Sequence, residues 1–164
     1  MVARCQALVL LCLGIPPAAS CRGNSPSKAG RNTVASSREL TAIGESLYAL
    51  ELRGARIAFS DSAGGEGAED LRHTVFASSI VMLRAAIAQD STDGQAWHWL
   101  GEALADRAYL GFGDWDSATA VASVNALQHA QRFLAAGDPI RATNDSLLAS
   151  ESKTVVYLRR KEPR

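Results

Sequence analysis

Hydrophobic residues in the first half of the chain recur at the spacing of one face of an α-helix. Such residues lie on one side of a helix because 3.6 residues complete a turn. Ser36 and Glu39, just before this pattern, have the S-x-x-E spacing of a capping box. The sequence therefore predicts a helix that begins near Ser36. Its apolar face in the stretch ELTAIGESLYALELRGARIAF is formed by Leu40, Ile43, Leu47, Leu50 and Ile57.

The same period predicts further helices after glycine-containing turns. They cover about residues 69–89, 94–108 and 117–136, and the tail after Pro139 contains one or two more. Aspartates stand immediately before the third helix and before the tail, where a side-chain oxygen caps free N–H groups. No segment alternates between apolar and polar residues over five or more positions. We therefore predict an all-α fold built from antiparallel helical hairpins.

The predicted helices repeat one another. The segment LTAIGESL aligns with WHWLGEAL, so that Gly44 matches Gly101 at an offset of 57 residues. The second and fourth helices align at an offset of 44, with IVMLRAA over VNALQHA. A glycine inside a helix costs about 0.5–1 kcal/mol relative to alanine. Two glycines at matching places therefore indicate that a partner helix approaches closely at both.

The third helix and the following turn resemble the tetratricopeptide repeat. The likeness rests on an aromatic-x-x-Leu-Gly-x-x-Leu helix and a Gly-Asp-aromatic-Asp-x-Ala turn. The matching residues are Trp97, Leu100, Gly101, Leu104, Gly113, Asp114, Trp115, Asp116 and Ala118. In the first unit, the corresponding packing residues are Leu40, Ile43, Gly44 and Leu47.

This chain departs from the usual repeat in two respects. Its units do not keep the repeat length of about 34 residues, and Leu40 stands where the family has an aromatic residue. The resemblance implies about two repeats and a C-terminal capping helix within residues 37–161. Because two repeats are fewer than the usual three, the capping helix or a partner would have to cover the open end.

The resemblance also implies that the first helix of each repeat lines a face that receives a protein or peptide. The residues expected on this partner-binding face are Thr41, Glu45, Tyr48, His98, Trp99 and Glu102. A solvated polar face without a ligand is the alternative. Trp97 and Trp99 lie about 200° apart around their helix. We therefore expect Trp97 inside its own hairpin, and Trp99 near the partner-binding face or the preceding hairpin.

The first 21 residues are a separate element. A basic start, the apolar run CQALVLLCLGI and the small residues of PPAASC are typical of a secretory signal peptide, which is too short to span a bilayer. The segment AASC resembles the lipobox of bacterial lipoproteins, although Ala18 stands where leucine is usual. The resemblance implies lipid attachment at Cys21 and a membrane of the cell envelope, with export without a lipid as the alternative. Residues 22–36, rich in Ser, Gly and Asn, predict a flexible linker.

Composition agrees with a globular domain and adds no catalytic motif. Apolar residues make up 47%, charged residues 21%, and the formal net charge is zero, which argues against disorder and against a nucleic-acid partner. His73, His98 and His129 lack the spacing of metal ligands. The sequence has no phosphate-binding glycine loop and no G-x-S-x-G nucleophile. We expect no catalytic residue, no metal and no cofactor.

These features together predict a non-catalytic, lipid-anchored scaffold that binds a protein or peptide partner in the cell envelope. One alternative is an envelope enzyme or accessory subunit with an acidic site, for which the sequence offers the loop cluster of Glu66, Glu69 and Asp70. The other alternative is a structural domain that associates with itself as a homo-oligomer.

Overall fold

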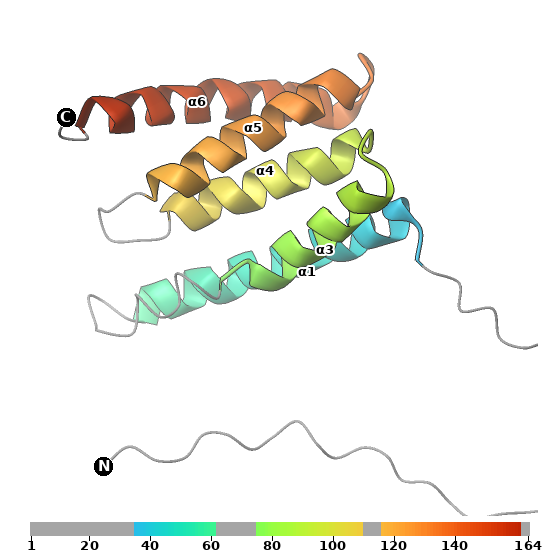
Figure 1. The fold of residues 1–164 in the computed structure, drawn as a ribbon. Helices are drawn as coiled ribbons and strands as arrows, with labels where there is room; N and C mark the ends of the chain where they lie inside the picture. The colour runs from blue at the N-terminus through green and yellow to red at the C-terminus, as the bar shows by residue number, and fades with distance from the viewer. Residues whose placement is uncertain (1–34, 62–74, 110–115, 162–164) are drawn as a thin grey trace, which may run out of the picture. The chain divides into compact units, whose positions relative to one another are not determined.

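The described part of the chain consists of α-helices. The structure is a computed structural model that describes residues 35–61, 75–109 and 116–161, all within the contact unit Val34–Arg164. The all-α prediction is confirmed, because these residues contain five helices and no strand (Figure 1). The helices are α1 (Ser37–Asp61), α3 (Ala77–Gln89), α4 (Gly94–Tyr109), α5 (Ser117–Phe133) and α6 (Pro139–Lys161).

Three helices begin at the caps that the sequence predicts. At α1, the N–H of Ser36 donates to Oε2 of Glu39 at 2.7 Å, and the N–H of Glu39 donates to Oγ of Ser36 at 3.3 Å. At α4 and α6, Oδ1 of Asp93 and of Asp138 accepts an N–H of the first turn at 3.0 and 2.9 Å. Local side-chain chemistry therefore decides where these helices start.

The second predicted helix begins later than its apolar period indicates. Residues 62–74 lie outside the described ranges, and after them Val75 and Phe76 form a turn before α3. Phe76 has φ of 61°, in the left-handed region, where a helix cannot continue. Its ring is fully buried and lies 5.4 Å from the ring of Tyr48. Burial of this aromatic side chain against α1 thus accompanies a backbone conformation that the helical period does not predict.

The helices form two antiparallel hairpins followed by a single helix (Figure 1). One hairpin is α1 with α3, and the next is α4 with α5. α4 packs against both helices of the first hairpin, and α6 packs against both helices of the second. The tail is therefore one helix, and α6 takes the place that the first helix of a third hairpin would occupy.

The matching glycines make the same contact in the two hairpins. A Cβ atom on Gly44 would lie 2.6 Å from Cγ of Leu83, and one on Gly101 would lie 2.6 Å from Cγ of Leu127. Both leucines are fully buried, and they are separated by the offset of 44 that aligns the second helices. The absence of a side chain at each glycine therefore admits the partner helix, as the repeat predicts.

Most of the predicted packing residues in the described ranges are buried or half-buried, and two are not; Leu50, predicted on the apolar face of the first helix, is also 62% exposed. Ile43 is 41% exposed, because it lies about 100° around α1 from the contact made by Gly44. Ala118 is exposed in the first turn of α5. Gly113 and Trp115 lie outside the described residues. The predicted packing residues that are covered are Leu40, Gly44, Leu47, Trp97, Leu100, Gly101 and Leu104.

The predicted export elements cannot be placed in this fold. The signal peptide, Cys21 and the linker up to residue 34 lie outside the described residues. Among the helices that are described, none has the length and apolar character needed to cross a membrane.

Candidate functional site

The side chains predicted to bind a partner lie on α1 and α4. α1 packs on α4, and α4 packs on α6, so we call the surface of these three helices the α1–α4–α6 face. The six side chains differ in exposure. Thr41, Tyr48 and His98 are only 4%, 6% and 2% exposed, whereas Glu45 is exposed and Trp99 and Glu102 are half-buried. The prediction that all six present a surface is therefore wrong for three of them, because these three point into the seams between successive hairpins.

Thr41 fastens α1 to the beginning of α4. Its hydroxyl donates to Oδ2 of Asp93 at 2.9 Å, and the hydroxyl of Ser37 donates to the same oxygen at 2.8 Å. Asp93 caps α4 with its other oxygen. The carboxylate of Asp93 therefore caps the N-terminus of α4 and also fixes the position of α1 beside it.

His98 joins α4 to α6 and is not available to a ligand. Nδ2 of Asn144 donates to the carbonyl oxygen of Leu127 at 3.1 Å, which turns Oδ1 of Asn144 toward Nδ1 of His98, also at 3.1 Å. Because Oδ1 is only an acceptor, Nδ1 of the imidazole carries the hydrogen. Burial lowers the pKa of His98, so the ring is neutral at neutral pH. Its Nε2 lies 3.6 Å from Oε2 of Glu102, too far for a hydrogen bond.

Tyr48 connects the first hairpin to α4. Its hydroxyl donates to Oδ2 of Asp106 at 2.7 Å, and its ring centroid lies 6.0 Å from that of Trp99. Burial raises the pKa of Tyr48, and the bond to Asp106 raises it further, so the phenol stays protonated as a donor. Trp99 therefore points toward the preceding hairpin, which is one of the two places that the sequence predicts for it.

Trp97 points into its own hairpin, as predicted. Its ring stacks on His129 of α5 with centroids 4.4 Å apart, and its Nε1 donates to the carbonyl oxygen of Ser91 at 2.9 Å. The side chain is half-buried. It covers the edge of the second hairpin and does not belong to the fully buried core.

Three partly or largely buried carboxyl groups lie along α4 and α6, and we call Glu102, Asp106 and Glu151 the carboxylate cluster. Burial raises the pKa of each. The charge of Asp106 raises the pKa of the other two further, and Glu45 adds to the effect on Glu102. The Tyr48 hydroxyl opposes the shift of Asp106, as does the nearby charge of Arg56 on α1. The cluster is therefore a region where negative charges lie close together and are incompletely solvated.

Glu151 is the most deeply buried member of the cluster. The residue is 8% exposed, and its Oε2 is buried without any hydrogen-bond partner. A buried polar atom without a partner destabilises the fold by about 1–3 kcal/mol. In the described residues, no three His, Cys, Asp or Glu side chains are placed to hold a metal ion. A proton or a donor from outside the described chain would satisfy this oxygen.

The sequence-based reasoning missed Asp106, Asn144 and Glu151. Asp106 carried a usable signal, because it follows Glu102 by four residues and thus lies on the same face of α4. Asn144 and Glu151 carried none, because their importance depends on which helices α6 packs against.

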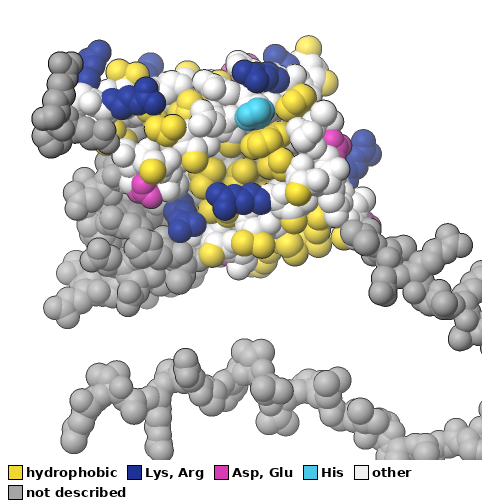
Figure 2. All heavy atoms as spheres, viewed as in Figure 1, with side chains coloured by type: hydrophobic (Ala, Val, Ile, Leu, Met, Phe, Trp, Pro, Cys, Tyr) yellow, Lys and Arg dark blue, Asp and Glu magenta, His cyan; other side chains and the backbone are white. Residues whose placement is uncertain are grey.

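The face toward the viewer in Figure 2 differs from the carboxylate cluster in the kinds of side chain that it presents. Hydrophobic side chains gather over its middle, Lys and Arg side chains are scattered around them, and few Asp or Glu side chains are visible. The large apolar side chains exposed on the described helices include Val81 of α3 at 63% and Phe133 of α5 at 40%. The side chains visible on this face are therefore mainly apolar and basic, whereas the carboxylate cluster gathers acidic groups.

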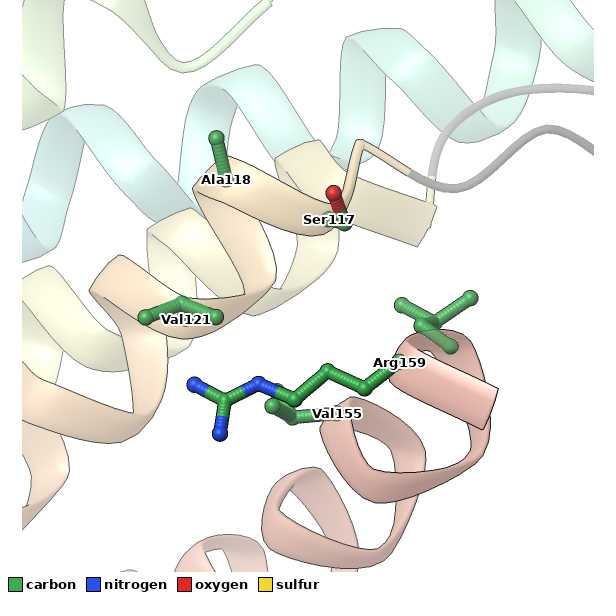
Figure 3. A pocket seen from close by; sticks show the side chains of 6 residues that line it. Ser117, Ala118, Val121, Val155 and Arg159 are labelled. Carbon is green, nitrogen blue, oxygen red and sulfur yellow. The ribbon is translucent and has the colours of Figure 1, made fainter. Parts of the chain in front are cut away.

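A shallow depression of about 350 Å³ lies between the start of α5 and the end of α6 (Figure 3). It is open to the surface and mostly apolar, and the side chain of Arg159 extends across it. It explains the exposure of Ala118, because α5 and α6 separate at this end. The residues that line it are Ser117, Ala118, Val121, Val155, Leu158 and Arg159.

Comparison of the chain with protein-family models, with curated proteins and with solved structures finds no match. Conclusions about function therefore depend on the geometry of the helices and of the carboxylate cluster.

Proposed function

We propose that this protein is a non-catalytic interaction module that binds a protein or peptide on its α1–α4–α6 face, with a helical-repeat scaffold of the tetratricopeptide type. The observation that carries the proposal is the repeated contact of Gly44 with Leu83 and of Gly101 with Leu127. α6 then continues the series by packing on α4 and α5. In stacked helical hairpins, one helix of each unit contributes to an extended surface that partners can use.

The residues of this face suit a binding role. Trp99 and Glu102 are half-buried and Glu45 is exposed, so an aromatic surface and carboxylates are accessible together. Thr41, Tyr48 and His98 hold the three helices beneath them through hydrogen bonds. A face held rigid in this way loses little conformational entropy when it binds a partner.

A selection from a random-peptide display library on the full chain tests this function. We expect enriched peptides that protect or shift α1, α4 and α6 in amide-exchange or NMR measurements. Trp99→Ala should weaken their binding, whereas Tyr157→Ala, which removes an exposed aromatic ring from α6, serves as the control variant. Failure to enrich any peptide, or protection confined to α3 and α5, would contradict the proposal.

We also propose that the chain is exported and anchored to an envelope membrane by a lipid on Cys21. Support comes from the signal-like residues 1–21 and the lipobox-like AASC. Mass spectrometry of the mature N-terminus tests the proposal, and a lipid mass on Cys21 is the expected result. An unmodified N-terminus at Arg22 or Met1 would contradict it.

The raised pKa values of Glu102 and Asp106 favour a second candidate, an enzyme in which a protonated carboxyl group acts as a general acid. Binding is the first proposal because the groups beside this pair are already engaged. Tyr48 donates to Asp106, and Nδ1 of His98 is bonded to Asn144.

A further inference from the structure

We propose that the partner of the α1–α4–α6 face presents an arginine side chain, whose guanidinium group binds between Trp99 and the carboxylate cluster of Glu102, Asp106 and Glu151. This inference rests on the proposed function, and it names the chemistry of the ligand that the face recognises.

Three of these side chains project from one face of α4. Trp99, Glu102 and Asp106 are spaced at i, i+3 and i+7, so they lie above one another along the helix. Tyr48 touches both ends of this row, because its ring lies 6.0 Å from that of Trp99 and its hydroxyl is 2.7 Å from Asp106. The contacts of Tyr48 therefore fix an indole ring and a carboxylate on the same part of the surface.

The negative charges near this row favour the binding of a cation. Asp106 acts on both Glu102 and Glu151, and Glu45 acts on Glu102 as well. Arg56, an exposed side chain of α1, is a described cation whose charge acts on Asp106. A solvent-exposed arginine compensates only weakly for carboxylates that are partly removed from water. A ligand that brings positive charge would relieve their repulsion.

Glu151 provides an independent sign that a donor is missing. The residue is more than nine-tenths buried, and its Oε2 accepts no hydrogen bond from the part of the chain that the structure describes. Asp106 lies close enough on α4 for its charge to affect Glu151 on α6. The donor that Oε2 lacks would enter where α4 and α6 pack together, on the side of Asp106.

A guanidinium group matches this arrangement better than an ammonium group. It is planar, carries five N–H donors and is weakly hydrated, so it can serve several carboxylates in a half-buried site. Its flat face also stacks on an indole ring, and Trp99 provides one. The placement of an aromatic ring beside several carboxylates is therefore selective for arginine.

The test uses four acetylated and amidated octapeptides of alanine and glycine that differ at one central position. This position holds arginine, lysine, citrulline or glutamate, and citrulline keeps the shape of arginine without its charge. Each peptide is titrated into the full chain while the indole NMR signals are followed. We expect the arginine peptide to bind with a shift of the Trp99 signal, and the citrulline peptide to bind about tenfold or more weakly, because charge-assisted hydrogen bonds are lost.

Isosteric variants locate the site. Glu151→Gln and Asp106→Asn should each weaken binding of the arginine peptide by about tenfold. Asp145→Asn is the matched control, because it removes one negative charge from the exposed side of α6, where Asp145 bonds to Gln131. Thermal unfolding of each variant shows whether it folds. Equal binding of the arginine and citrulline peptides, or unchanged binding by both folded cluster variants, would overturn the arginine site.

The outcome separates this inference from the proposed function. Library peptides that bind the α1–α4–α6 face without any basic residue would overturn the arginine site and leave the interaction module in place. If the arginine peptide does not bind at all, the arginine site is likewise overturned. If the library yields no binding peptide, the proposed function itself fails.

Discussion

The two hairpins share a glycine–leucine contact but differ in the side chains around it. In the first hairpin, Tyr48 and Phe76 pack with ring centroids 5.4 Å apart. At the offsets of 57 and 44, the second hairpin has Ala105 and Ala120 at these places, and both alanines are buried. The aligned positions are thus filled by aromatic rings in one unit and by methyl groups in the other, and Phe76 lies in the turn before α3 whereas Ala120 lies inside α5.

This difference changes how the next helix packs. The aromatic pair of the first hairpin meets Trp99 of α4, so that this seam is filled largely by rings. In the second hairpin, Ala120 lets Val155 of α6 approach α5. Polar groups of α6 also enter this seam, where Asn144 bonds to both neighbouring helices. Repetition of a backbone contact therefore does not imply repetition of the chemistry beside it.

We call the packing of α4 against the first hairpin the first seam, and the packing of α6 against the second hairpin the second seam. The largest expected effect is the loss of the buried polar contact in the second seam. Asn144→Ala would leave the buried Nδ1–H of His98 without a partner and would remove the second bond to the carbonyl oxygen of Leu127, which keeps its helical bond, so we expect a loss of about 2–4 kcal/mol in the free energy of unfolding. Thr41→Val, the comparable change in the first seam, should destabilise by only about 0.5–1.5 kcal/mol, because Asp93 keeps its bond to Ser37. Urea denaturation measures both, and equal losses would remove the distinction between the seams.

An intermediate effect is expected where the two hairpins are alike. Gly44→Ala and Gly101→Ala should each destabilise the fold by about 1–3 kcal/mol, since the new methyl group would overlap the buried leucine opposite. Gly101→Ala should be the worse of the two, because its Cβ would also lie 3.3 Å from the backbone nitrogen of Leu127, against 3.5 Å for Leu83.

Gly54 supplies the internal control for these substitutions. It lies within α1, and a Cβ atom there would meet nothing within 4 Å. Gly54→Ala should therefore stabilise the protein by about 0.5–1 kcal/mol through helix propensity alone. Thermal or urea unfolding of the three variants compares them directly. A stabilising effect of alanine at Gly44 or Gly101 would show that the repeat contact is not tight.

The smallest expected effect is a pH dependence that belongs to the second seam. Because burial raises the pKa of Glu151 above its ordinary value of 4.5, protonation favours the folded state. Its contribution to stability is fully present below that ordinary value and is lost as the pH rises through the raised pKa. Glu151→Gln removes this titration, so the variant should gain stability relative to the natural chain as the pH rises between about pH 4 and pH 8.

Glu39 provides a control of opposite sign, because its hydrogen bonds to Ser36 lower its pKa. Its stabilising effect is present above the ordinary pKa of glutamate and lost as the pH falls. Glu39→Gln should therefore lose stability relative to the natural chain as the pH rises. Unfolding curves at several pH values give the difference in stability between each variant and the natural chain. The contribution of His98 is the same in both proteins and cancels in this difference. A pH-independent difference for Glu151→Gln would contradict the role of burial.

Much of the fold was predictable because its causes are local. The cap formed by Ser36 and Glu39 acts over three residues, and the turn that leads into Pro139 includes its own cap, Asp138. The start of α3 was not predictable from its period, because burial of Phe76 against Tyr48 accompanies a turn at that point. The exposure of Ile43 was not predictable either, because an apolar period does not show how wide a part of the helix its neighbour covers.

The sequence by itself determined the helical class, most of the helix starts and the matching of Gly44 with Gly101. These features depend on contacts within one helix or on a repeat that is visible along the chain. Only the tertiary structure decided that His98 is buried, that Trp99 and Asp106 both contact Tyr48, and that the charge of Asp106 acts on Glu151. The reason is that neighbours of a helix face come from distant parts of the chain, and their side chains determine whether a polar residue is a structural contact or a binding group.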